Sequence, residues 1–184
     1  MSKLLRKILS AAVFPAALMI VSKIAGMILV NTVYDLPWRI EMMTDTWFSI
    51  QITYPDQASA ILCNSYSHVS VILALTIGTG ILLFQTFFLN VHFQNPKVII
   101  RLIQFDFLLW LSEGSTIFPK LVVWLAFLWI ATLIVTAQAL QSLVYPWISN
   151  AGIVISTLAT WLSARGFERE ISTLLPEHDT LRAV

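Results

Sequence analysis

The sequence predicts an all-α membrane protein with four transmembrane helices and both termini on the cytoplasmic side. The first observation is composition, because 58% of the 184 residues are hydrophobic and only 11% are charged, against about 25% charged in ordinary soluble domains. The second is that the apolar residues gather in runs long enough to cross a bilayer. The third is a one-sided distribution of basic residues. The whole chain, 1–184, is expected to form a single membrane domain.

The four expected spans are apolar stretches close to the roughly 20 residues that a helix needs to cross a membrane. They cover residues 8–33, 69–91, 121–144 and 147–164. The first follows a basic flank, as a secretory signal does, but it continues without a small-residue cleavage site, so we expect an uncleaved anchor. The spans leave an outer loop at 34–68, an inner segment at 92–120 and a cytoplasmic tail at 165–184.

The basic residues give the expected orientation, because lysine and arginine near span ends concentrate on the cytoplasmic side. Nine of them fall on one side of the four-span arrangement: Lys3, Arg6, Lys7, Lys97, Arg101, Lys120, Arg165, Arg169 and Arg182. The other side holds Arg39 together with the acidic residues Asp35, Glu41, Asp45 and Asp56. We therefore expect a multi-pass protein of the bacterial plasma (inner) membrane with both termini in the cytoplasm.

The outer loop is expected to be partly extended. In "WFSIQITY", residues 47–54, apolar and polar side chains alternate with the period of a strand. Such a strand needs a partner within the loop or on another protein, so an isolated extended segment packed on the bundle is the favoured interpretation and a paired strand is the alternative. Asp56 follows and is placed to cap a helix leading into the second span.

The inner segment is expected to contain one cytoplasmic helix lying at the membrane interface. Residues 98–111 are apolar but short, and they carry Arg101 and Asp106. On a helix, Asp106 and Glu113 fall on the face opposite Lys97 and Arg101. This acidic face either contacts a basic surface, with candidates Lys120, Arg165 and Arg169, or is simply solvated.

Small residues repeat every fourth position along the fourth expected span: Gly152, Ser156, Thr160 and Ala164. A ridge of small side chains lets helix backbones approach closely in a membrane. The ridge is expected to be buried inside the bundle, the alternative being association with another membrane protein.

Lys23 lies within the first expected span, where a charge costs roughly 3 kcal/mol or more. It lies roughly 15 Å below the outer boundary at 1.5 Å per residue, deeper than a lysine reaches comfortably. Gln138, in the outer half of the third span, can accept a proton from the ammonium group. We therefore predict a Lys23–Gln138 pair; outward snorkelling and a ligand or transport site are the alternatives.

Residue patterns typical of catalysis are missing from the sequence. The single cysteine, Cys63, cannot form an internal disulfide, and the three histidines show no metal-ligand spacing. There is no glycine-rich phosphate loop, and residues 69–91, 121–144 and 147–164 contain no Asp, Glu, Lys, Arg or His. We expect no catalytic residues, cofactor, metal or nucleic-acid partner.

These observations favour a non-enzymatic subunit or scaffold of a membrane assembly. Its expected partners are the lipid bilayer and either another membrane protein or a second copy of the chain. The alternative is a small carrier or a bundle that binds a lipid or an anionic ligand through Lys23. A carrier needs a polar path through the membrane, and the sequence offers few polar residues for one.

Overall fold

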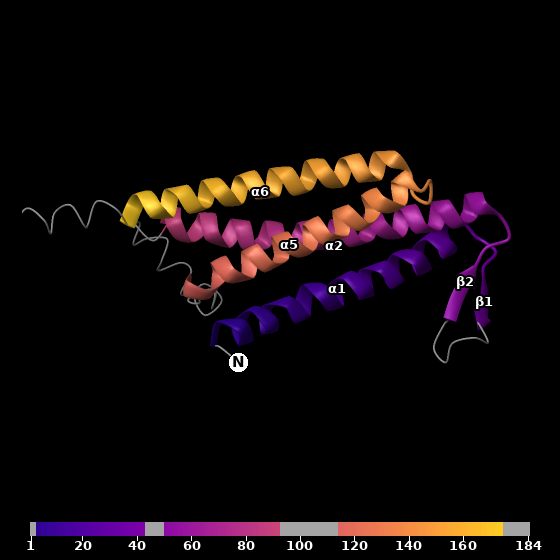
Figure 1. The fold of residues 1–184 in the computed structure, drawn as a ribbon, viewed down its shortest axis with the longest axis horizontal. Coiled ribbons are helices and arrows are strands. Elements are labelled where there is room, and N and C mark those ends of the chain that lie inside the picture. The colour runs from indigo at the N-terminus through magenta and orange to yellow at the C-terminus, as the bar shows by residue number, and fades with distance from the viewer. Residues whose placement is uncertain (1–2, 43–49, 93–113, 175–184) are drawn as a thin grey trace, which may run out of the picture.

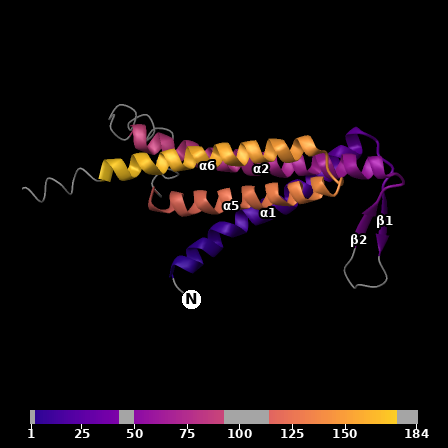
Figure 2. The same cartoon turned by 45° about the horizontal axis from the view of Figure 1, so that its top comes forward.

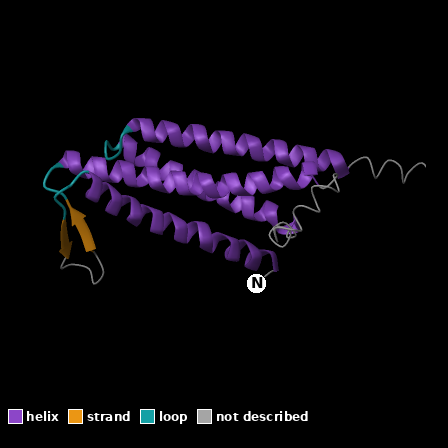
Figure 3. Cartoon of the chain, turned by 180° about the vertical axis from the view of Figure 1, so that it is seen from behind, coloured by secondary structure: helices purple, strands orange, loops and turns teal. Residues whose placement is uncertain are grey.

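The computed structural model describes residues 3–42, 50–92 and 114–174. They form four long helices: α1 (Lys3–Val33), α2 (Gln57–His92), α5 (Gly114–Leu140) and α6 (Pro146–Leu174). The helices lie side by side along most of their lengths, and a two-stranded hairpin lies at one end of the bundle (Figure 1, Figure 3). We call this the hairpin end and the other the far end.

Three of the described helices are long and apolar enough to cross a membrane. The qualifying stretches are Ser10–Val33, Gln57–Thr86 and Pro119–Leu140, which overlap the first three predicted spans. Helix α6 contains the fourth predicted span, 147–164, but does not qualify. Its amide and hydroxyl side chains, such as Asn150, Thr157 and Thr160, lower its hydropathy relative to that of the other helices.

The stretch of α2 that is apolar enough to cross a membrane begins at Gln57, earlier than the second span predicted to begin at residue 69. Residues 57–68 were assigned to the outer loop, but they form the first turns of α2 and pack into the bundle. The Ser59 backbone N–H donates to Asp56 Oδ2 at 2.9 Å, which satisfies one of the free donors at the helix start. The predicted cap at Asp56 is thus confirmed, whereas the loop boundary at residue 68 was wrong.

Helix α5 ends before residue 144, the limit predicted for the third span. Its last turn closes with Leu143 N–H donating to Gln138 O at 2.9 Å, and Ser142 takes a positive φ of 58°. This is the hydrogen-bond pattern of a Schellman motif, in which a left-handed residue ends the helix. Pro146 then starts α6, at the position where its missing N–H costs nothing.

The predicted strand finds its partner inside the same loop. Strands β1 (Arg39–Met42) and β2 (Ile50–Thr53) pair antiparallel, with Arg39 opposite Thr53 and Met42 opposite Ile50. The hairpin stands away from the helices in both views (Figure 1, Figure 2). The structure therefore shows a paired strand and not an isolated segment packed on the bundle.

Close approach of small residues holds α6 against its neighbours. Gly152 lies against Ile72 and Thr132, where an added Cβ would come within 3.3 Å of each. The hydroxyls of Thr132 and Ser156 are 2.8 Å apart, and Trp129 Nε1–H donates to Thr160 Oγ1 at 3.0 Å. Three residues of the predicted ridge thus contact α5.

Thr160 and Ala164, the last two residues of that ridge, are exposed, so only Gly152 and Ser156 are buried as predicted. A strict four-residue step drifts around a helix that has 3.6 residues per turn. The buried positions Gly152, Ser156, Ala159 and Gly166 follow the helical period more closely.

Candidate functional site

A network of polar side chains connects α1, α2 and α5 near the hairpin end. Lys23, on α1, is half-buried. Its ammonium group donates to Asn64 Oδ1 at 2.8 Å and lies 3.4 Å from the backbone oxygen of the same residue. Asn64 is on α2, in the first turns that the sequence analysis placed in the loop.

Asn64 connects the network to α5. Its amide Nδ2 donates to Gln138 Oε1 at 3.0 Å and to Leu143 O at 3.1 Å, in the turn that precedes α6. His68 lies one helical turn after Asn64, and its Nε2 is 2.8 Å from the same Gln138 oxygen. We call Lys23, Asn64, His68 and Gln138 the polar network.

The lysine fixes the direction of every hydrogen bond in the polar network. An ammonium group can only donate, so the Asn64 atom facing it is the oxygen, and the Asn64 NH₂ group faces Gln138. The Gln138 atom is then an oxygen, which can only accept. His68 must therefore carry a proton on Nε2. Only one assignment of donors and acceptors is therefore consistent with the polar network.

The structure brings the two residues of the predicted Lys23–Gln138 pair into one network but places Asn64 between them. Sequence reasoning missed Asn64 because it began the second span at residue 69. It also excluded histidine from spans two to four on that boundary, which was wrong, since His68 is buried within α2. The usable signal was the four-residue spacing of Asn64 and His68, which places both on one helix face.

Other contacts at the hairpin end tie the same elements together. Ser65 Oγ accepts from Tyr145 N–H at 3.0 Å. The rings of Tyr34 and Tyr66 stack with centroids 5.9 Å apart, and Tyr66 meets Trp147 edge-on at 6.4 Å. The ends of α1, α2 and α6 are therefore joined by aromatic contacts of the kind found where helices leave a membrane.

The hairpin is anchored through Tyr54, directly after β2. Its hydroxyl donates to Asn31 Oδ1 at 3.0 Å and lies 2.9 Å from Cys63 Sγ. Partial burial, together with the neighbouring thiol, raises the pKa of Tyr54 to about 12. The hydroxyl therefore remains protonated at neutral pH and can donate.

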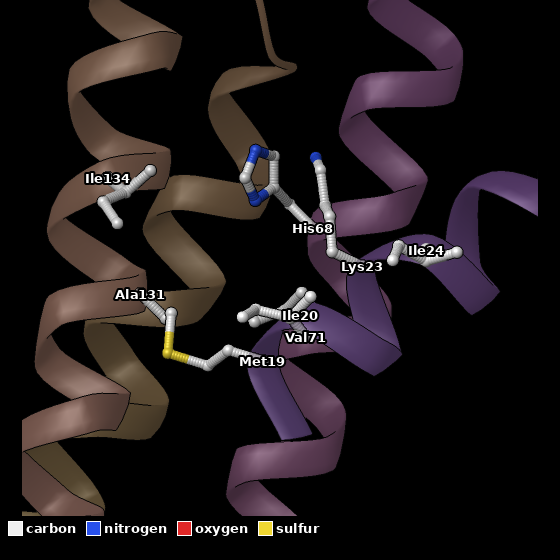
Figure 4. Close-up of a pocket in the computed structure, with 8 residues that line it drawn as sticks. All are labelled: Met19, Ile20, Lys23, Ile24, His68, Val71, Ala131 and Ile134. Atoms are coloured by element: carbon white, nitrogen blue, oxygen red, sulfur yellow. The ribbon is translucent and has the colours of Figure 1, made fainter. Parts of the chain in front are cut away.

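A pocket of about 300 Å³ lies between α1, α2 and α5, next to the polar network. Lys23 and His68 extend toward one end of it, and the remaining wall is made of aliphatic and methionine side chains (Figure 4). The lining residues are Met19, Ile20, Lys23, Ile24, His68, Val71, Ala131 and Ile134.

The two acidic members of the predicted cytoplasmic charge cluster, Asp106 and Glu113, lie outside the described residues, as does the predicted interfacial helix at 98–111. The predicted inner segment, 92–120, reaches into α5, because its residues from Gly114 onward are the first turns of that helix. Arg165 packs its guanidinium 4.2 Å from the centre of the Trp161 ring. Arg169 and Lys120 occupy the far-end turns of α6 and α5.

Within residues 3–42, 50–92 and 114–174, no three His, Cys, Asp or Glu side chains are grouped closely enough to hold a metal ion. Comparison with known proteins adds no relative, because no family model, curated protein or solved structure matches the chain. The function must therefore be argued from the geometry.

Proposed function

We propose that this chain is a non-enzymatic subunit of a membrane assembly, in which the helices form a rigid intramembrane base and the hairpin binds a partner outside the membrane. The observation that carries this proposal is the hairpin, whose strands pair only with each other among the described residues. A two-stranded hairpin is marginally stable alone in water. A partner surface would supply the missing stabilisation.

The outer edges of β1 and β2 offer the chemistry for such a partner. Each edge of a sheet carries backbone N–H and C=O groups that another strand can pair with. The chain keeps the hairpin at a fixed place, because Tyr54 joins it to α1 and α2. The polar network fixes those helices relative to α5. This is the arrangement expected of a docking element.

We further propose that α6 is a fourth span and that both termini are cytoplasmic. Its outward side chains Val154 and Leu158 are more than half exposed, as lipid-facing residues would be. Trp147 and Trp161 lie toward the two ends of the proposed span, 147–164, where indoles favour the membrane interface. Basic residues of the described helices support the orientation: Lys3, Arg6, Lys7, Lys120, Arg165 and Arg169 are at the far end, opposite the hairpin.

Cysteine labelling tests the orientation. Native Cys63 is buried, so it is first replaced by serine, and a cysteine is introduced at Ser115. A membrane-impermeant maleimide should label this cysteine only when applied to the cytoplasmic face. Labelling from the outer face would overturn the four-span arrangement.

Photo-crosslinking in native membranes tests the subunit proposal. A photoreactive amino acid replaces Arg39 or Thr53 on the hairpin, and the matched control replaces Val154 on the exposed face of α6. We expect protein adducts of one defined mass from the hairpin positions and lipid adducts from Val154. Co-expression of two differently tagged copies distinguishes a second copy from a different protein. If both hairpin positions give no protein adduct, the proposal fails.

A further inference from the structure

The pocket and the polar network together have the composition of a site for an amphiphile. The pocket wall is apolar: Lys23 and His68 line one end of it with carbon atoms, and their nitrogen atoms lie beyond that end, in the polar network. The pocket volume of about 300 Å³ is at the lower end of the range for small-molecule sites.

The charge of Lys23 has no counter-ion among the described residues. Its contacts there are two oxygens of the neutral residue Asn64. Neutral acceptors satisfy hydrogen bonds, but they leave the net charge of the ammonium group in an apolar environment, where an uncompensated charge is costly. An anion beside Lys23 would compensate it.

The ammonium group also has one N–H donor that its contacts with Asn64 do not use. It carries three N–H donors, and the two oxygens of Asn64 account for two of them. His68 Nε2–H already donates to Gln138, so Lys23 is the charged group in the network with a spare donor. An incoming anion would therefore bind to Lys23 and leave the other hydrogen bonds unchanged.

The bilayer side of the bundle provides the route into the pocket. Ile20, Ile24 and Ile134 line the pocket, yet 63%, 53% and 42% of their respective surfaces are exposed. These residues belong to α1 and α5, on stretches apolar enough to lie within the membrane. A ligand dissolved in the bilayer can reach the pocket between them without crossing water.

We propose that this pocket binds a single-chain amphiphile with an anionic head group, a carboxylate or a phosphate monoester, whose hydrocarbon chain fills the apolar wall while the anion pairs with Lys23. The site is independent of the proposed subunit function, since it uses a different face of the molecule from the hairpin.

Photolabelling of the full-length protein in a neutral detergent tests the site. Three diazirine probes share one hydrocarbon chain and differ in the head group: a fatty acid, the corresponding alkyl phosphate and the fatty alcohol. We expect at least fivefold more labelling by one or both anionic probes than by the alcohol, mapped to peptides of α1 or α5. The anionic probe that labels best identifies carboxylate or phosphate as the natural head group. Equal labelling by the alcohol would overturn the proposal.

Variants separate the two parts of the site. Lys23→Met should reduce anionic labelling at least fivefold, whereas Lys23→Arg should retain it. Lys120→Met removes the same charge from the far end and should label like the wild type. Ile134→Phe keeps Lys23 but narrows the pocket, and should reduce labelling by all three probes. The proposal fails if Lys23→Met or Ile134→Phe, shown to be folded by its melting transition, labels like the wild type.

Discussion

The hairpin end and the far end of the bundle are held together by different kinds of contact. At the hairpin end, hydrogen bonds join Lys23, Asn64, His68 and Gln138, and the donor and acceptor of each bond can be assigned in only one way. Toward the far end the contacts are mainly steric: the Trp124 ring fills the place of the missing side chain at Gly78, beside the fully buried Leu75 and Leu128.

This difference follows from how membrane helices associate. Inside lipid there is no hydrophobic gain from bringing two apolar helices together, so close packing and interhelical hydrogen bonds must supply the attraction. Packing depends on shape and tolerates changes of similar volume. A polar network depends on every member, because losing one leaves another buried group without its partner. The two ends should therefore respond differently to substitution.

The largest effect is expected at the centre of the polar network. Gln138→Leu removes the acceptor shared by Asn64 and His68, so the buried His68 loses its acceptor and Asn64 Nδ2 keeps only Leu143 O, and we expect a loss of about 3 kcal/mol in the free energy of unfolding. Lys23→Met should cost less, because it removes the charge together with its need for a partner. Melting temperatures in one detergent measure both variants, and a larger loss for Lys23→Met would contradict this description of the hairpin end.

The packing of α6 should give the next largest effect. Ser156→Leu places a large side chain where the hydroxyl faces Thr132 at 2.8 Å, at an expected cost of about 1–3 kcal/mol. The control Val154→Leu lies on the exposed face of the same helix and should change the melting temperature little. Similar shifts for the two variants would show that the small residues of α6 do not make a close contact.

A smaller change tests the steric contact toward the far end. Gly78→Ala adds a Cβ in direct conflict with the Trp124 ring, and we expect a net loss of about 1 kcal/mol after the better helix propensity of alanine is included. Gly80→Ala is the matched control, because its added Cβ would meet nothing within 4 Å; it should raise the melting temperature. If Gly78→Ala is stabilising as well, the contact is not tight.

The smallest effect is expected at the exposed cap of α2. The Ser59 hydrogen bond lowers the pKa of Asp56 below its ordinary value, so the folded state favours the carboxylate. The cap therefore stabilises the protein at neutral pH and is lost as the pH falls through the folded-state pKa. Asp56→Ala should melt below the wild type at pH 7, and the gap should close in acid. A gap that is unchanged in acid would exclude the cap as its cause.

The sequence predicted the helices better than it predicted the site. Long apolar runs in a sequence directly indicate helices that can cross a membrane, so the expected spans overlap α1, α2 and α5. The second span was predicted to begin at residue 69 because Ser59, Asn64 and Ser67 give the first turns of α2 a polar composition typical of loops. Tertiary contacts with α1, α5 and the turn before α6 satisfy Asn64 and Ser65, and a single sequence does not display such contacts.

The same limitation explains why Gln138 was predicted as the direct partner of Lys23. The argument from depth correctly placed both residues at one level of the bundle, but depth says nothing about which helices are neighbours at that level. Asn64 became available only when residues 57–68 were seen to be helical. The hairpin shows the converse case, because the alternation in residues 47–54 is a local signal, and it predicted β2 without knowledge of the rest of the fold.

A double-mutant cycle between Lys23 and Asn64 tests the central claim most directly, namely that Asn64 holds the buried charge in place. The melting transitions of the wild type, Lys23→Met, Asn64→Leu and the double variant are measured in one detergent. We predict that Asn64→Leu costs about 1–3 kcal/mol less when Lys23 is already methionine, because no ammonium group is then left without an acceptor. Additive losses, with no coupling between the two positions, would contradict the claim.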